Sequence, residues 1–152
     1  MLRTRLNEAL KEAMRAKNTR ATSTLRLILA ALKDRDIAAR TRGITDGVDE
    51  AEILSMLQTM VKQRRDAIVL YEQGGRQELA QQEREEIEVI EGFMPKQLSE
   101  DEVQAAVDGL IRETGAAGIK DMGRVMAELK TRYSGQMDFT KASGLVRARL
   151  AG

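Results

Sequence analysis

The feature that most constrains the fold of this chain is the spacing of its aliphatic residues, which recur at every third or fourth position. Near the N-terminus, for example, Leu2, Leu6 and Leu10 follow this pattern. Such spacing places the apolar side chains on one face of a helix. The chain has only two Phe, two Tyr and no Trp, whereas strands are rich in aromatic and β-branched residues. The sequence therefore predicts an all-α fold.

Seven segments carry the helical pattern. Their predicted ranges are 2–17, 22 or 23 to about 43, 49–73, 76–91, 99–114, 121–133 and 138 onward. Gly74-Gly75 separates the third segment from the fourth, and we expect these two to form a long helical hairpin. Asn18 is expected to end the first helix, and Thr22 or Ser23 to cap the second. The clearest start is the capping box Ser99-Glu100-Asp101-Glu102.

The three segments after residue 99 are short and are separated by loops that contain glycine. Seven of the 12 glycines lie in residues 99–152. The single proline, Pro95, lies just before these short, glycine-containing segments. Because proline interrupts a helix, it marks the best domain boundary. We expect an N-terminal helical domain over residues 1–94, with a helical bundle and the long hairpin, and a three-helix C-terminal domain over residues 99–152.

The residues that the chain lacks exclude several classes of chemistry. It has no Cys and no His, so Cys/His zinc sites, thiolate nucleophiles and Ser-His-Asp triads are impossible. The glycine-rich loops that hold nucleotide phosphates are absent as well. We therefore expect no catalytic centre, no cofactor and no metal site. No apolar run reaches the length of a membrane span, and the N-terminus lacks a signal-peptide core, so a cytoplasmic protein without membrane contact is expected.

Charge is distributed unevenly along the chain. Residues 1–43 contain 11 basic and four acidic residues, net +7, whereas residues 44–102 are net −9 and residues 103–152 are net +3. An anionic partner is thus permitted at either end of the chain but not along its middle.

One candidate site lies on the long hairpin. Arg64 falls within the apolar stripe of the third segment, and Glu83 and Glu86 fall within that of the fourth. Counted from the Gly-Gly turn, the three lie at matching heights, so we expect Arg64 to pair with the glutamates. An acid/base or binding site and a structural ion pair that fixes helix register both use these residues, and the second is favoured.

A second group of candidates is basic and lies in the C-terminal part. The helical phase places five cations away from the apolar stripes: Lys120, Arg124, Lys130, Lys141 and Arg147. Gly118 and Gly123 leave backbone amides open near a helix N-terminus, where phosphate can bind. Only Tyr133 and Phe139 offer rings nearby, so any nucleic acid would be held mainly through its phosphates. Ordinary solubilising charge is the other interpretation, and both stay open here.

Four motifs, in order, are similar to those of the GatB/YqeY family and its stand-alone YqeY-like proteins. The motifs are Ser23-Thr24-Leu25-Arg26-Leu27, the stretch from Lys62 through Gly74-Gly75-Arg76 to Glu83, Met94-Pro95-Lys96-Gln97-Leu98-Ser99, and Met122-Gly123-Arg124-Val125-Met126. Together they cover essentially the whole chain.

This resemblance implies an all-helical protein whose C-terminal domain is similar to the tail of the B subunit of tRNA-dependent amidotransferase. In that enzyme the tail is thought to contact tRNA, while another domain carries the chemistry. The family label of carbon–nitrogen ligase with glutamine as amido-N-donor follows from the same resemblance. We therefore expect a tRNA-associated module without its own catalytic centre, whose partners are tRNA and an amidotransferase or other tRNA-handling protein. A protein–protein adaptor that does not contact RNA is the alternative.

Overall fold

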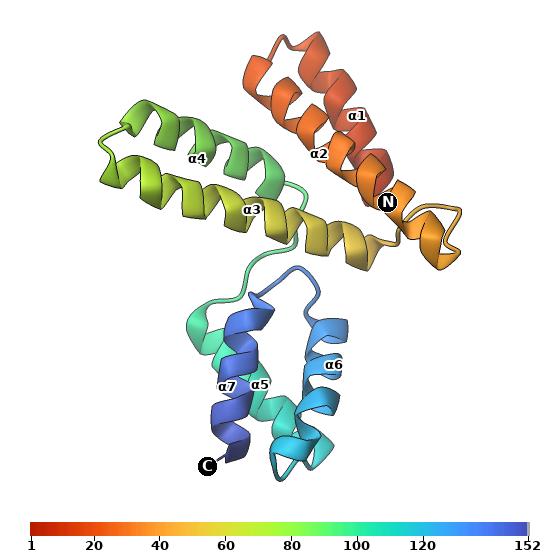
Figure 1. The fold of residues 1–152 in the computed structure, drawn as a ribbon, viewed down its shortest axis with the longest axis vertical. Helices are drawn as coiled ribbons and strands as arrows, with labels where there is room; N and C mark the ends of the chain where they lie inside the picture. Colours follow the sequence, from red (N-terminus) through yellow and green to blue (C-terminus); the bar gives the residue numbers. More distant parts are fainter. Residues whose placement is uncertain (152) are drawn as a thin grey trace. The chain divides into compact units, whose positions relative to one another are not determined.

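The computed structural model describes residues 1–151, and every regular element in that range is helical (Figure 1), which confirms the all-α class. The elements are α1 (Leu2–Arg15), α2 (Thr19–Ala39), the 3₁₀ helix η1 (Arg40–Arg42), α3 (Glu50–Gln73), α4 (Gln77–Glu91), α5 (Glu100–Thr114), the 3₁₀ helix η2 (Ile119–Asp121), α6 (Met122–Arg132) and α7 (Phe139–Ala151). They form two compact units, Met1–Met94 and Pro95–Gly152. Among the described residues no helix has both the length and the hydropathy needed to cross a bilayer.

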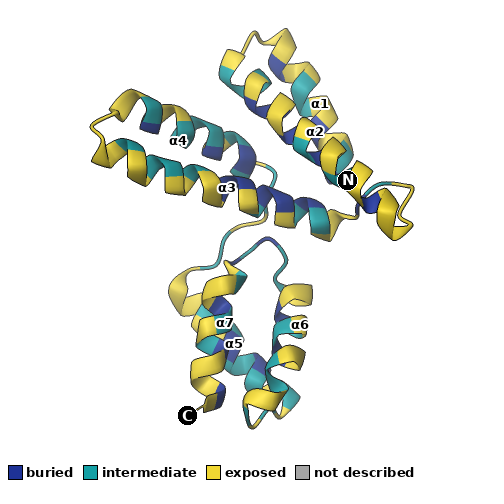
Figure 2. Cartoon of the chain, in the orientation of Figure 1, coloured by how far each residue is buried: buried dark blue, intermediate teal, exposed yellow. Residues whose placement is uncertain are grey.

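The N-terminal unit consists of two helical hairpins, α1 with α2 and α3 with α4, and α2 also packs against α4. Each of the four helices contributes a side chain that is 0% exposed: Leu6, Ile28, Leu57 and Ile90. In Figure 2 the buried residues follow the faces on which these helices meet. Burying one such side chain stabilises the fold by about 1.5–3 kcal/mol, so this apolar core is what holds the two hairpins together.

The start of α2 differs from the sequence prediction. The helix begins at Thr19, because the side-chain oxygen of Asn18 accepts a hydrogen bond from the N–H of Ala21 at 3.1 Å. Asn18 therefore caps α2, and the predicted cap at Thr22 or Ser23 is wrong. The Ser23 hydroxyl instead donates to a carbonyl oxygen one turn earlier in the same helix.

A polar network joins α1, α2 and the loop that leads into α3. One guanidinium nitrogen of Arg3 lies 2.7 Å from the Asp36 carboxylate, and the other donates to the Val48 carbonyl oxygen at 3.1 Å. The N–H of Val48 donates back to Asp36 at 2.9 Å. The hydrogen bond from Arg3 lowers the pKa of Asp36 below its usual value. Gly47 makes room for this contact, since a Cβ there would lie 2.7 Å from the Arg3 side chain.

The C-terminal unit packs α5, α6 and α7 around a second apolar core. Its buried members are Val107, Leu110, Val125, Leu129, Met137, Ala142, Val146 and Leu150. The predicted capping box opens α5: Ser99 accepts from the N–H of Glu102, whose carboxylate accepts from the N–H of Ser99. Asp49 opens α3 in a similar way, since its carboxylate accepts from the N–H of Glu52. Local capping signals thus set the starts of both helices.

The segment after Pro95 is fastened to the loop between α6 and α7. The N–H of Leu98 donates to the Gln136 carbonyl oxygen at 2.9 Å, and the side-chain amide of Gln97 donates to the Gly135 carbonyl oxygen. These bonds hold the chain in place immediately before the capping box of α5.

That each unit is a domain able to fold alone stays a prediction, and the separate cores make it testable. We expect residues 1–94 and 95–152, expressed separately, each to give a helical circular dichroism spectrum and a cooperative melt. The shorter piece should melt at the lower temperature, because a domain of about 60 residues buries only about 60% of its unfolded surface. Loss of the helical signal from either piece would contradict the expectation.

Candidate functional site

A charged cluster lies between α3 and α4, where the apolar face of α3 continues beyond its last buried residue. The Nε atom of Arg64 lies 3.0 Å from a carboxylate oxygen of Glu86 and 4.0 Å from one of Glu83. The guanidinium also donates to the Met60 carbonyl oxygen at 3.1 Å. The side chains of Arg64, Glu83 and Glu86 are only 13%, 20% and 16% exposed. The structure thus brings together the three residues that the hairpin register predicted.

The cluster has one guanidinium for two carboxyl groups, and the carboxyl group whose pKa changes is that of Glu83. Burial is the largest cause that raises the pKa of Glu83, and the charge and hydrogen bond of Glu86 raise it further. Arg64, and Arg20 from α2, act in the opposite direction. Glu83 is therefore the member of the cluster that is driven toward the protonated form.

The geometry favours the structural interpretation of this cluster over the catalytic one. The bond to Met60 holds the Arg64 guanidinium along its own helix, and the bond to Glu86 ties it to α4. A pair of this kind fixes the register of two helices, because a shift along the axis would leave a buried charge without a partner. Among the described residues, no group of three or more acidic side chains is placed to hold a metal ion.

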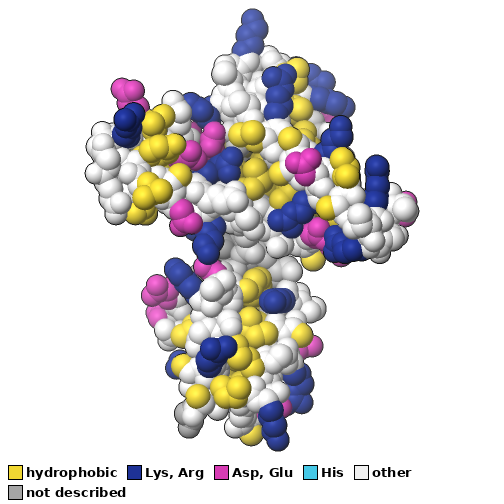
Figure 3. Space-filling model, in the orientation of Figure 1, with side chains coloured by type: hydrophobic (Ala, Val, Ile, Leu, Met, Phe, Trp, Pro, Cys, Tyr) yellow, Lys and Arg dark blue, Asp and Glu magenta, His cyan; other side chains and the backbone are white. Residues whose placement is uncertain are grey.

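All five cations predicted in the C-terminal part are exposed. Arg124 forms an ion pair with Asp121 at 3.4 Å. The side chains of the other four form no ion pair or hydrogen bond with the described part of the chain: Lys120, Lys130, Lys141 and Arg147. The side chain of Arg112 on α5 is also exposed and without a partner in the described chain. The sequence did not reveal it, because the local pattern does not show which arginines form ion pairs. Figure 3 shows basic side chains spread over the visible face of this unit.

The paired arginines of this unit bind three of the carboxylates on α5 and α6: Asp108, Glu113 and Glu128. Arg132 binds Glu113 at 2.8 Å and Glu128 at 3.2 Å, while Arg149 binds Asp108 at 2.7 Å. These three carboxylates therefore have basic neighbours, whereas Glu100 and Asp101 in the first turn of α5 form no ion pair with the described part of the chain.

The loop at Gly118, one of the two glycines beside which a phosphate was expected, already contains a carboxylate of the chain. The carboxylate of Asp121 accepts a hydrogen bond from the N–H of Ala117 at 2.9 Å. Backbone hydrogen bonds, that from Ala117 first, lower the pKa of Asp121. An anionic group of the chain itself therefore occupies the place in which a phosphate was expected.

We expect Arg64→Ala to destabilise the protein by about 3 kcal/mol, because it leaves two carboxyl groups partly buried without their cation. Arg65→Ala is the matched control. The Arg65 side chain is 61% exposed and its pair with Glu91 spans 3.7 Å, so its loss should cost less than about 1 kcal/mol. Urea unfolding of both variants gives the comparison, and equal stability of the two would contradict the structural role of Arg64.

We expect Glu83→Gln to stabilise the protein at neutral pH. The folded-state pKa of Glu83 is raised, so its protonated form stabilises the fold at low pH, and this contribution is lost as the pH rises through that pKa. The amide cannot ionise, so melting temperatures measured between about pH 4 and pH 8 should fall less with rising pH in the variant. The exposed Glu88→Gln should behave like the parent, and a Glu83→Gln profile parallel to that of the parent would refute the expectation.

Curated relatives of this chain are named altered inheritance of mitochondria protein 41, mitochondrial. The Eremothecium gossypii protein is 28% identical over 96% of this chain and 79% of its own length. The Pyrenophora tritici-repentis protein is 31% identical over 84% of this chain and 71% of its own length. The match to the Lachancea thermotolerans protein, 30% identical, covers 71% of this chain and 57% of that protein.

These names contradict the cytoplasmic location that the sequence led us to expect, since all three relatives are named as mitochondrial proteins. The expectation was wrong because the lack of an apolar signal-peptide core tests only for secretion. Mitochondrial targeting segments are basic and amphipathic instead, so that criterion carried no information about them.

The family comparison agrees with the relatives and extends over nearly the whole sequence. The family described as Yqey-like protein matches residues 3–150, which include both compact units. The chain therefore belongs to the YqeY-like protein family.

Proposed function

We propose that this protein is a non-catalytic helical module that binds tRNA through phosphate contacts made by its C-terminal unit. The observation that carries the proposal is the set of exposed cations on η2, α6 and α7 that have no partner in the described chain: Lys120, Lys130, Lys141 and Arg147. Binding a phosphate with these side chains breaks no existing ion pair. Contacts of this kind supply most of the sequence-independent affinity for nucleic acids.

Two glycines inside helices of the same unit support this assignment. Gly144 lies between Lys141 and Arg147 on α7, and Gly123 lies in the first turn of α6. A Cβ at either position would meet no atom within 4 Å, so the fold does not require glycine there. Glycine within a helix costs about 0.5–1 kcal/mol relative to alanine. Both positions leave the helix backbone open beside free cations, which suits close approach of a phosphodiester chain.

The link to amidotransferase-type tRNA maturation is the finer part of the proposal. It rests on the similarity of the C-terminal segment to the tail of the amidotransferase B subunit. In this role the protein contributes tRNA binding, and the chemistry belongs to a partner enzyme, since the chain has neither Cys nor His for nucleophilic or acid/base catalysis.

A protein–protein adaptor is the second candidate, and exposed apolar side chains on α3 favour it. Val69 and Leu70 are 55% and 68% exposed near the end of the long hairpin. Adjacent exposed apolar residues are a feature of surfaces that bind other proteins.

We expect reversal of the four free C-terminal cations to glutamate to weaken tRNA binding at least tenfold at low salt. Each lost phosphate contact should also reduce the slope of log affinity against log salt by about 1. Stability should change little, because all four side chains are exposed. Filter binding of total tRNA at several salt concentrations, with melting curves of the variant, gives both results.

The control is an equal charge reversal in the basic N-terminal unit, at exposed positions outside any buried cluster: Lys11, Arg15, Lys33 and Arg40. If this control abolishes binding and the C-terminal variant does not, the site assignment is wrong. If the parent protein fails to bind tRNA even at low salt, the adaptor function replaces the proposal.

A further inference from the structure

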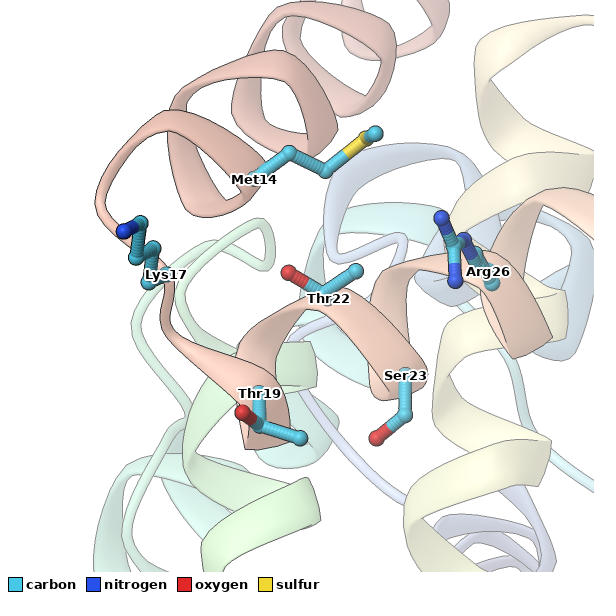
Figure 4. A pocket seen from close by; sticks show the side chains of 6 residues that line it. All are labelled: Met14, Lys17, Thr19, Thr22, Ser23 and Arg26. Atoms are coloured by element: carbon cyan, nitrogen blue, oxygen red, sulfur yellow. The ribbon is translucent and has the colours of Figure 1, made fainter.

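A pocket of about 330 Å³ lies at the junction of α1 and α2, within the N-terminal unit (Figure 4). Its lining residues are Met14, Lys17, Thr19, Thr22, Ser23 and Arg26. In Figure 4 Lys17 and Arg26 stand on opposite sides with Thr22 between them, and Met14 faces them from α1. The lining thus offers two cations, three hydroxyl groups and no carboxylate.

The cations of the pocket have no partner in the part of the chain that the structure describes. The side chains of Lys17 and Arg26 form no ion pair or hydrogen bond there. Their neighbours on α1 differ, because Lys11 and Arg15 are paired with glutamates one turn earlier. The hydroxyls of Thr19 and Thr22 also have no hydrogen-bond partner in the described chain, so the pocket presents unused donors.

The fold accounts for only half of the motif Ser23-Thr24-Leu25-Arg26-Leu27. Thr24 and Leu25 are 0% and 2% exposed and pack into the core. Ser23 and Arg26 lie on the other side of α2 and line the pocket. Core packing therefore accounts for Thr24 and Leu25, whereas the side chains of Ser23 and Arg26 face a pocket that a ligand could occupy.

The backbone at Lys17 is also unusual. This residue is the only non-glycine among the described residues with a positive φ, at 57°. Glycine or asparagine normally takes this left-handed position after a helix. A lysine here is strained relative to glycine, yet its position places an ammonium group at the rim of the pocket.

The chemistry of the lining selects a phosphate-bearing ligand. Guanidinium, ammonium and hydroxyl groups are the usual donors to phosphate oxygens, and no acidic side chain lines the pocket to repel an anion. The volume exceeds that of a bare phosphate and falls at the lower end of the range for organic ligands, about 300–1,000 Å³. Met14, half exposed, supplies an adaptable apolar wall.

We propose that this pocket binds a nucleotide, with its phosphate held between Lys17 and Arg26 and its organic part against Met14. The phosphate belongs either to a free nucleotide or to the 5′ end of an RNA strand. The pocket lies in residues 14–26, apart from the cations assigned to tRNA binding, so this inference does not depend on the proposed function.

The test is calorimetric titration of the full chain with AMP, with adenosine and inorganic phosphate as comparison ligands. We expect AMP to bind, adenosine to show no binding, and phosphate to bind more weakly than AMP. Arg26→Ala and Lys17→Gly should each weaken AMP binding about tenfold, the effect of losing one charge-assisted contact. Lys17→Gly should at the same time raise the melting temperature, because glycine relieves the left-handed backbone; this separates loss of binding from loss of folding.

Lys33→Ala is the matched control, since Lys33 is an exposed, unpaired cation on the same helix outside the pocket. Its AMP affinity should equal that of the parent. Equal weakening by Lys33→Ala, or AMP binding unchanged in both pocket variants, would overturn the site.

Short RNA strands with and without a 5′-phosphate identify the source of the ligand. Preference for the phosphorylated strand that is lost in Arg26→Ala assigns the pocket to RNA ends, whereas AMP binding without that preference assigns it to free nucleotides. If neither AMP nor the 5′-phosphate is recognised by the parent, the proposal is wrong. The C-terminal charge reversal should leave AMP binding unchanged, whatever its effect on tRNA.

Discussion

The N-terminal unit depends on one constraint, the burial of an aliphatic side chain from each of its four helices at a common core. Leu6, Ile28, Leu57 and Ile90 are fully enclosed. The apolar face of α3 extends beyond this core, and its last buried residue is Val61. Arg64 lies one turn further on, so an ion-pair cluster joins α3 to α4 at the point where the side chains of α3 become less buried.

Most of the helices could be predicted from the sequence because the signals that define them are local. The 3.6-residue periodicity, the Ser99 capping box and the Gly-Gly turn act within a few residues, and the turn also placed Arg64 opposite Glu83 and Glu86. The Arg3–Asp36–Val48 network could not be predicted, since its members are 12 to 45 residues apart. Only one of the two roles of Asn18 was predicted: its N–H bonds the Ala13 carbonyl oxygen at the end of α1, and its side chain also caps α2. The carboxylate of Asp121 was overlooked because only the folded loop brings it to the Ala117 amide.

The distribution of charge in the folded chain differs from the net charge of its segments. The C-terminal part is net +3 and the N-terminal 43 residues are net +7, which suggests by itself that an anion would prefer the N-terminus. Ion pairing reduces this difference without reversing it, because Arg3, Lys11, Arg15 and Arg42 are each bound to a carboxylate. Cations without an ion pair in the described chain thus remain in both units: on the C-terminal helices, and at and along α2, where Lys17 and Arg26 stand beside hydroxyl groups.

In each unit, much of the packing is between helices that follow one another in the sequence, such as α1 with α2, α3 with α4 and α6 with α7. Their contacts therefore close short loops, and chains rich in such local contacts fold within roughly microseconds to milliseconds. A ribosome adds only about 5–20 residues per second, which is slow on that scale. The N-terminal core can thus be complete while the C-terminal helices are still being synthesised. A nascent chain of this protein would then expose a finished bundle, and not four amphipathic helices with open apolar faces, to chaperones and to neighbouring chains on the polysome.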